Sequence, residues 1–270
     1  MTNALPGKAL RVEGLSKRFG GITAVRDVSF SVPEKAIVAV IGPNGAGKTT
    51  LFNLISGFHH PDEGRIYFGG HDITKLEAEQ IASAGVIRTF QIVRLFNQMT
   101  ALENVLVGCH LNTRGSVISS ILTPGWLRDQ EKRIRREAEE LLSMVSLARV
   151  ADTPAGNLTC GQQRLVEIAR ALAAHPKLLM IDEPAAGLNS LETRELLALI
   201  QRIRDGGITV LLVEHDMSLV MNVADEIQVL NFGERIASGS PQEIQAHPAV
   251  IEAYLGRTGK ALPRGTAHHV

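Results

Sequence analysis

A glycine-rich segment has the composition and spacing of a phosphate-binding loop. The segment "GPNGAGKTT" fits G-x-x-x-x-G-K-[ST] from Gly42 to Thr49, between an apolar strand and a predicted helix. Its glycines allow backbone N–H groups to converge on a β-phosphate, Lys48 neutralises β/γ charge, and the Thr49 hydroxyl can bind Mg²⁺. A tight turn would explain the glycines but not Lys48 and Thr49. The residues predicted to contact the nucleotide here are Gly42, Pro43, Asn44, Gly45, Ala46, Gly47, Lys48, Thr49 and Thr50.

Two adjacent carboxylates follow an apolar strand farther along the chain. In "LLMIDEP", four apolar residues precede Asp182 and Glu183, which therefore emerge at the edge where ligands bind in a doubly wound sheet. We expect Asp182 to hold Mg²⁺ through its water shell and Glu183 to polarise an attacking water. His215 follows the strand "TVLLVE", and the same argument places it near the γ-phosphate or that water.

A second candidate anion site opens the segment "LTCGQQR". Thr159 and Gln162 form a T-x-x-Q capping box, which satisfies the first free N–H groups of a helix. Gly161 allows another molecule to approach those N–H groups and the positive end of the helix dipole. A cap without a ligand would explain Thr159 and Gln162 but not Gly161. The segment therefore predicts a contact with a second phosphate.

The elements that must position these residues follow from hydrophobic periodicity and capping boxes. A helix over 74–85 is predicted to begin at the box Thr74 with Glu77, and another begins at Thr100 with Glu103. Alternating apolar residues predict strands over 9–19, 24–32 and 36–42 and a hairpin over 64–73.

The character of the chain changes between about residues 92 and 157. A long charged helix is predicted over 128–150, and an insertion of uncertain shape lies at 113–128. Strands and helices then alternate, which indicates a parallel sheet with crossover helices, and a last helix begins at Ser240. The apolar face of the long helix comprises Ile134, Ala138, Leu141, Leu142 and Val145.

Composition excludes several classes of protein. Lys plus Arg and Asp plus Glu both total 28, so the formal net charge is 0 and bulk nucleic-acid binding is not expected. The two cysteines lack metal-ligand spacing and are expected to be reduced thiols. The chain shows neither an apolar run long enough for a membrane helix nor a signal peptide. We therefore expect a soluble protein. If it acts at a membrane, a partner protein is expected to hold it there.

These motifs together resemble the nucleotide-binding subunits of ABC transporters over nearly the whole chain. The Walker A, Walker B, signature, D-loop and H-loop motifs correspond to "GPNGAGKTT", "LLMIDEP", "LTCGQQR", "AAGLN" and "VEHD". The resemblance identifies Gln91 in "RTFQ" as the Q-loop residue, which contributes to both catalysis and Mg²⁺ binding. It also matches Phe19 to an aromatic residue that stacks on adenine, although Phe19 could equally belong to the core.

The resemblance implies an α/β fold with a P-loop NTPase (RecA-like) core, an N-terminal antiparallel β subdomain and an inserted α-helical subdomain. Its cofactors are ATP and Mg²⁺. The implied catalytic residues are Glu183, His215 and Gln91, and the implied metal contacts are Thr49, Gln91 and Asp182. Within a single ABC ATPase domain over 1–270, the implied divisions are a nucleotide-binding core with the β subdomain (1–91 and 166–239), the helical subdomain with the signature (92–165), and a C-terminal helix and tail (240–270).

Two departures from the family pattern point to a subgroup. Cys160 replaces the first signature glycine and Asn189 the usual D-loop aspartate. Both occur in the branched-chain amino acid importer ATPases of the LivG type, which "GQQRLVEIARAL", "DEPAAGLNSLET", "VEHDMSLVM" and "VIEAYLG" also resemble. An ABC ATPase for another cargo (urea or a lipid) is the alternative in the same class. Soluble ABC ATPases without a membrane partner and P-loop small-molecule kinases fit the motifs less well.

The resemblance also implies partners and a location. They are two transmembrane permease subunits, a second and non-identical ATPase, and indirectly a periplasmic or surface substrate-binding protein, with no nucleic acid. The chain would lie peripherally on the cytoplasmic face of the inner membrane. Leu95 and Phe96, close after Gln91, would suit a groove for a permease helix, although either could be core. Head-to-tail pairing would bring Thr159, Gly161 and Gln162 against the ATP of the other subunit.

Overall fold

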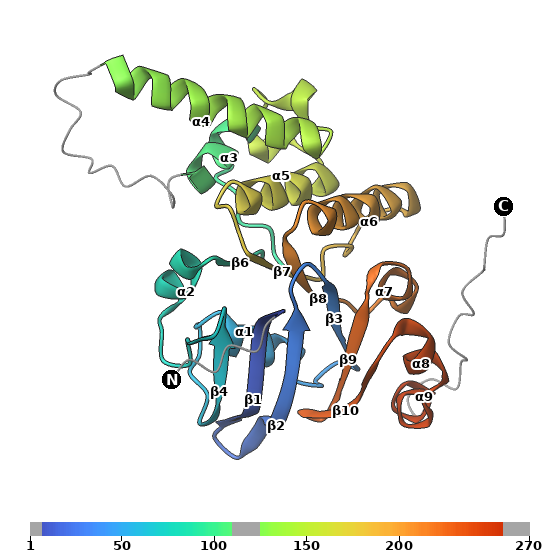
Figure 1. Cartoon of the computed structure of the whole chain (residues 1–270). Helices are drawn as coiled ribbons and strands as arrows, with labels where there is room; N and C mark the ends of the chain where they lie inside the picture. The colour runs from blue at the N-terminus through green and yellow to red at the C-terminus, as the bar shows by residue number, and fades with distance from the viewer. Residues whose placement is uncertain (1–6, 110–124, 256–270) are drawn as a thin grey trace.

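The computed structural model describes residues 7–109 and 125–255 and contains two β-sheets (Figure 1). A four-stranded antiparallel sheet has the order β2-β1-β4-β5, and a six-stranded sheet has the order β10-β9-β3-β8-β7-β6. The strands are β1 Lys8–Phe19, β2 Ile22–Pro33, β3 Ile37–Ile41, β4 Glu63–Phe68, β5 His71–Asp72, β6 Val86–Arg88, β7 Leu178–Asp182, β8 Thr209–Val213, β9 Glu226–Asn231 and β10 Glu234–Gly239.

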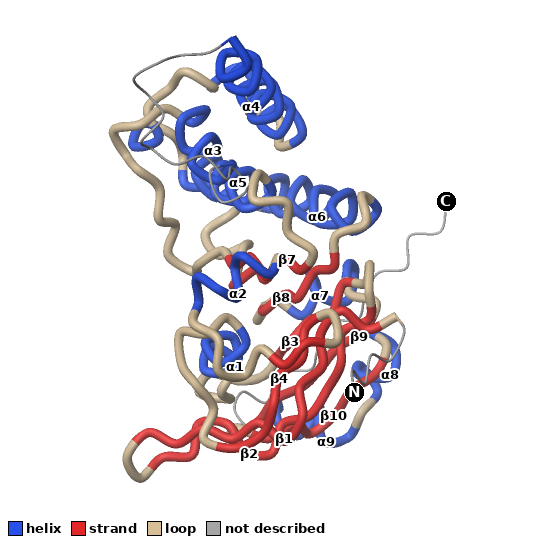
Figure 2. Tube along the Cα trace, turned by 60° about the vertical axis from the view of Figure 1, so that its left-hand side comes forward, coloured by secondary structure: helices blue, strands red, loops and turns tan. Residues whose placement is uncertain are grey.

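The helices fall into groups at different places in the molecule. Figure 2 shows α3, α4 and α5 at one end and the antiparallel strands at the other, while α8 and α9 lie beside β10. The helices are α1 Lys48–Ile55, α2 Ala78–Ala84, α3 Ala101–Cys109, α4 Gly125–Met144, α5 Cys160–Leu172, α6 Ser190–Asp205, α7 Met217–Val223, α8 Pro241–Ala246 and α9 Pro248–Leu255, with short 3₁₀ turns at Ala148–Val150 and Ala155–Asn157.

The six-stranded sheet separates two hydrophobic cores. β9, β3, β8, β7 and β6 pair in parallel, and β10 adds an antiparallel edge. Successive side chains of a strand point to opposite faces, so Ile37, Ala39 and Ile41 join one core while Val38 and Val40 join the other. The strands β3, β7 and β8 are buried throughout. Because they are covered on both faces, their sequences are almost continuously apolar rather than alternating.

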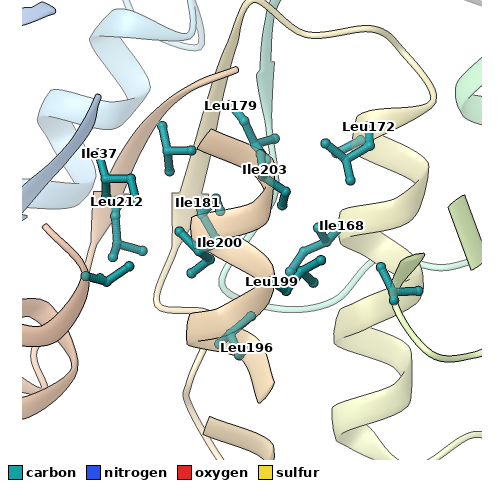
Figure 3. Packing of buried hydrophobic residues seen from close by; sticks show 14 of the residues in the cluster. Ile37, Ile168, Leu172, Leu179, Ile181, Leu196, Leu199, Ile200, Ile203 and Leu212 are labelled. Carbon is teal, nitrogen blue, oxygen red and sulfur yellow. The ribbon is translucent and has the colours of Figure 1, made fainter. Parts of the chain in front are cut away.

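One core is formed where α6 lies between the sheet and α5 (Figure 3). Leu196, Leu199, Ile200 and Ile203 of α6 are at most 1% exposed, and their i, i+3, i+4, i+7 spacing places them on one helix face. The other core joins α1 to the antiparallel sheet. The predicted architecture is confirmed: an α/β fold with an antiparallel β subdomain and a helical region.

One predicted helix start is wrong. The helix α2 begins at Ala78, and its capping box consists of Glu77 and Gln80 rather than Thr74 and Glu77. The Thr74 hydroxyl instead accepts a 2.9 Å hydrogen bond from the Ile66 backbone, and Asp72 accepts one of 2.9 Å from the Thr74 backbone. Thr74 therefore closes the β4–β5 hairpin and is unavailable to cap a helix.

The long helix predicted over 128–150 ends earlier than expected: α4 stops at Met144, Ser146 adopts φ 63°, and Ala148–Val150 form a separate 3₁₀ turn. Two further predicted helix starts are confirmed. Boxes at Thr100 with Glu103 and at Ser240 with Glu243 are both present, and the predicted apolar face of α4 packs against the core. Most of the insertion at 113–128 lies outside the described residues.

The bounds of the helical subdomain, 92–165, stay a prediction. The helix α5, Cys160–Leu172, begins inside these bounds and ends beyond them. None of the helices within 7–109 and 125–255 combines the length and apolarity needed to cross a membrane.

Candidate functional site

The glycine-rich loop connects β3 to α1 at the carboxyl edge of the parallel sheet. Gly42 adopts φ 152°, and a Cβ there would lie 2.1 Å from the Leu230 carbonyl oxygen. Gly47 caps α1 with φ 98°, and a Cβ there would lie 2.4 Å from the Ala24 carbonyl oxygen. Neighbouring backbone therefore excludes side chains at both positions. The resulting loop leaves the N-terminus of α1 open, which suits phosphate.

The Lys48 ammonium lies over this loop. Its Nζ donates hydrogen bonds of 2.7 Å to the Gly42 carbonyl and 3.1 Å to the Pro43 carbonyl. Burial lowers the pKa of Lys48, while the nearby carboxylates of Glu183 and Asp182 act in the opposite direction. The ammonium is thus held by carbonyl groups at the position where nucleotide phosphates would supply a stronger anionic partner.

Adjacent strands bring the predicted catalytic side chains together. Glu183, His215 and Gln91 follow β7, β8 and β6, which are neighbours in the sheet. Gln91 Nε2 donates a 2.8 Å hydrogen bond to Glu183 Oε2, and His215 Nδ1 lies 3.6 Å from the same oxygen. Glu183 has φ 45°, a left-handed conformation that is unusual outside glycine and is often found at functional sites. The three residues therefore form one polar cluster around Glu183.

Asp182 has a partner that the sequence argument missed. Its Oδ2 lies 2.9 Å from Nη2 of Arg88, and both side chains are almost fully buried. Arg88 Nη1 also donates to Asn53 at 2.7 Å and to Ser56 at 3.0 Å, on or just after α1. The signal in the sequence is a single arginine at the end of a short apolar strand. Arg88 therefore joins the phosphate-loop helix to the strand that carries Asp182.

A second missed residue is Glu214, whose side chain is 0% exposed. Its Oε1 accepts a 3.0 Å hydrogen bond from the Ala185 backbone, and its Oε2 accepts one of 3.1 Å from the His215 backbone. Burial raises the pKa of Glu214, and these N–H groups oppose that rise. Glu214 thus anchors the segment after Glu183 to the segment that carries His215.

Most of the loop (Asn44–Thr50) lines one cleft of about 730 Å³ together with Gln91 and Glu183. Gly42, Pro43 and His215 are not among the residues that line it. Phe19 is half exposed, stacks edge-on against His59, and is not among the residues that line the cleft. The lining residues that sequence reasoning missed are Gly21, Ile22, Thr23, Ala24, Arg26 and Phe232.

The signature segment is folded as a helix start outside this cleft. Thr159 and Gln162 form the predicted capping box, with hydrogen bonds of 3.0 and 3.2 Å. Gly161 has a packing role as well, because a Cβ there would lie 2.9 Å from Glu192 Oε1. Thr159, Gly161 and Gln162 are absent from the described lining of the cleft. Their phosphate contact within this subunit is therefore not formed.

The side chains at the cleft fit Mg²⁺ bound together with a nucleotide. Among the described residues, no cluster of three or more His, Cys, Asp or Glu side chains exists that could hold a metal by itself. Mg²⁺ typically binds through one or two carboxylates together with substrate phosphates and water. The Thr49 hydroxyl, the Asp182 carboxylate and the Gln91 amide oxygen supply donors of this type.

Two family models match the chain. The model described as "ABC transporter" matches residues 25–186, and the model described as "Branched-chain amino acid ATP-binding cassette transporter" matches residues 234–259. The first match covers the phosphate loop, the signature and both carboxylates. The second covers β10, α8 and α9.

Individual proteins extend this likeness over most of the chain. The branched-chain amino acid transport ATP-binding protein BraF of Pseudomonas aeruginosa is 48% identical over 248 residues, which are 92% of this chain and 97% of BraF. The corresponding LivG of Escherichia coli K12 is 47% identical over 249 residues, with the same shares. Among solved structures, the ADP conformation of MJ1267, an ATP-binding cassette of an ABC transporter, aligns with a TM-score of 0.80 and 36% identity. That alignment covers 93% of this chain and 99% of MJ1267.

Proposed function

We propose that this chain, which belongs to the ABC transporter family, powers the uptake of branched-chain amino acids through partner permeases. The chain is an ATPase of that family. The cargo is supported by the model that matches 234–259 and by BraF and LivG, whose names specify branched-chain amino acid transport. Partner permeases belong to the proposal because BraF and LivG are named as ATP-binding proteins of transport systems.

ATP would bind in the cleft with its phosphates over the loop Gly42–Thr49. Lys48 would exchange its carbonyl partners for phosphate oxygens, and Thr49, Asp182 and Gln91 would hold Mg²⁺. The metal would neutralise phosphate charge and orient the γ-phosphate for in-line attack. Arg88 orients Asp182 through its 2.9 Å contact.

Glu183 is the residue that would polarise the attacking water. Gln91 holds its Oε2 atom with a 2.8 Å hydrogen bond, and His215 Nδ1 lies 3.6 Å from the same atom. A hydrogen bond from His215 to the γ-phosphate or the water would complete the site. The observation that carries the ATPase mechanism is the convergence of Glu183 and Gln91 with the glycine-rich loop on one cleft.

The signature segment would act on the nucleotide of a second ATPase subunit. Thr159 and Cys160 are exposed at the first turn of α5, while the described lining of the chain's own cleft does not include them. A helix N-terminus exposed in this way can receive a phosphate from another molecule. We propose that the second subunit is a non-identical ATPase, as the LivG-type resemblance suggests.

A groove beside the Q-loop is the proposed site for a permease helix. It has a volume of about 470 Å³ and is largely apolar. Phe96 is 53% exposed on its wall, whereas Leu95 packs against the core. A cytoplasmic helix seated there would lie next to Gln91, and the whole chain would lie on the cytoplasmic face of the membrane. The residues lining the groove are Ile87, Arg88, Phe96, Val107, Gly108, Glu167, Arg170, Ala171 and Ala174.

The cargo is tested by uptake in cells from which the gene has been deleted. Labelled leucine uptake should be lost and should return with the wild-type gene but not with Glu183→Gln. Uptake of labelled urea and of a labelled lipid is measured in the same cells, to test the alternative cargoes. Unchanged leucine uptake with a loss of urea or lipid uptake would replace the proposed cargo. Unchanged uptake of all three would favour a role outside transport.

A further inference from the structure

The peptide backbone at Phe90 and Gln91 is held by side chains of α5. Arg164 Nη1 donates a 2.6 Å hydrogen bond to the Phe90 carbonyl, and Arg164 Nη2 donates one of 2.8 Å to the Gln91 carbonyl. Glu167 Oε1 accepts a hydrogen bond of 3.4 Å from the Phe90 backbone N–H. Two side chains, one turn apart on a single helix, thus hold three backbone groups of the Q-loop.

The two side chains are buried and also bind each other. Arg164 Nη1 lies 3.2 Å from Glu167 Oε2, and the side chains are 4% and 2% exposed. Burial raises the pKa of Glu167, while Arg164 and the backbone N–H groups of Phe90 and Arg94 oppose that rise. Hydrogen bonds that involve a charged group in a buried setting are strong and directional. The Q-loop backbone is therefore fixed relative to α5.

The helix α5 connects this contact to the signature segment. Its N-cap is Thr159, and Arg164 lies little more than one turn beyond it. At the other side of the Q-loop, the Gln91 side chain reaches Glu183 at 2.8 Å. A displacement of the N-terminal turn of α5 must therefore move the Gln91 backbone as well. The chain of contacts runs from Thr159 through Arg164 and Gln91 to Glu183.

We propose that Arg164 and Glu167 are positioning residues that make the location of Gln91 against Glu183 depend on the position of the signature helix of the same subunit. The inference rests on the proposed function, in which the signature contacts the ATP of the partner subunit. Engagement of that ATP would move or brace α5, and Arg164 would transmit the change to the chain's own Gln91. Each site would then hydrolyse ATP only when the opposite site is closed.

Stability and positioning can be separated by the choice of variants. Removing one member of a buried ion pair leaves an unpaired charge and destabilises the fold, whereas replacing both members with apolar residues is often neutral. Glu167 Oε1 also lies 4.0 Å from Arg170 Nη2, whose side chain is 19% exposed. Arg164→Met therefore leaves the buried Glu167 with only this longer contact, whereas Arg164→Met with Glu167→Leu leaves Arg170 as a partly exposed cation. Both variants lose the hydrogen bonds to the Q-loop carbonyls. Arg202→Met, on the exposed face of α6, is the matched control.

The first measurement is hydrogen exchange in the isolated subunit with bound ATP. Both Arg164 variants should show exchange roughly tenfold or more faster in peptides that span 88–96, the scale of a lost charged hydrogen bond. Thermal stability should recover in the double variant while this exchange stays fast. ATP affinity and exchange at 42–55 should match the wild type. Wild-type protection of 88–96 in the double variant would overturn the proposal.

The second measurement is ATP turnover of the subunit assembled with its partners. Arg164→Met, Gln91→Ala and their combination form a double-mutant cycle. If Arg164 acts through Gln91, the combined variant should be no slower than Gln91→Ala. If the fold losses of turnover in the two single variants multiply in the combined variant, the proposal is overturned. Absence of ATP-dependent transport in the wild-type assembly would instead contradict the proposed function. The hydrogen exchange of the isolated subunit would still test whether Arg164 holds the Q-loop.

Discussion

Gln91 Nε2 donates a 2.8 Å hydrogen bond to Glu183 Oε2, although the two residues are 92 positions apart in the sequence. Each follows a strand of the same parallel sheet, and β6 and β7 are neighbours. The bond ties the loop that borders the proposed permease groove to the residue proposed to activate water. If a permease helix occupies the groove as proposed, it would affect hydrolysis through this side chain.

Glu183→Gln should bind ATP normally and hydrolyse it roughly a hundredfold or more slowly, because an amide cannot accept the proton of the attacking water. Turnover and nucleotide binding of the assembled protein provide the measurement. Glu195→Gln, on the exposed face of α6, is the control and should leave both unchanged. Near-normal turnover in Glu183→Gln would remove Glu183 from the proposed role.

ATP binding should weaken as pH rises into the alkaline range. Burial lowers the pKa of Lys48 below its ordinary value of 10.5 in the free protein, and the triphosphate favours the charged form. Binding therefore takes up a proton wherever free Lys48 is partly deprotonated. Titration calorimetry from about pH 7.5 to about pH 10 should show the loss of affinity. Lys48→Ala should bind weakly and show little of this dependence; an equal slope in that variant would exclude Lys48 as its source.

Phe96→Glu should release the protein from membranes that contain its permeases without affecting its fold. Phe96 is 53% exposed on the groove, so a charge there meets solvent in the free subunit and an apolar partner in the complex. Leu95→Glu should mainly destabilise the fold, because Leu95 packs against the core. Membrane sedimentation and thermal melting separate the two outcomes. Retention of Phe96→Glu on the membrane would place the groove elsewhere.

A negative charge at the signature should block ATP-driven association but not ATP binding to the single subunit. Gly161→Asp places a carboxylate where the partner's phosphate is proposed to lie, but its Cβ also meets Glu192. Cys160→Asp, at an exposed position, introduces the charge without that contact. Both variants should lose association and turnover in light-scattering and ATPase assays. Loss of ATP binding in the isolated Cys160→Asp subunit would contradict the arrangement in trans.

The two cysteines should differ sharply toward thiol reagents. Cys109 is 5% exposed, and burial raises its pKa to about 11, so little thiolate forms at about pH 8. Cys160 is exposed and should react first. ATP together with the partner ATPase should protect Cys160, with Glu183→Gln used to keep the assembly closed. Equal labelling of Cys160 with and without assembly would argue against burial of the signature at a subunit interface.

Motifs and periodicity were predictable because they depend on residues close together in the chain. The Gly42–Thr49 spacing, the apolar strand before Asp182 and the Thr159–Gln162 box could each be identified from a short segment. The order of strands and helices then implied a parallel sheet whose edge collects Asp182, Glu183 and His215. These features account for the fold class and the catalytic cluster.

The tertiary structure decided the contacts that join distant segments. Arg88 and Asp182 are 94 positions apart, and Arg164 and Gln91 are 73 apart. The sequence likewise pointed to Thr74 as a helix cap, but pairing of β4 with β5 places its hydroxyl against Ile66. Such contacts depend on which strands become neighbours and on the direction from which a helix crosses them. Those are properties of the packed sheet and its two cores, which no local pattern of residue types specifies.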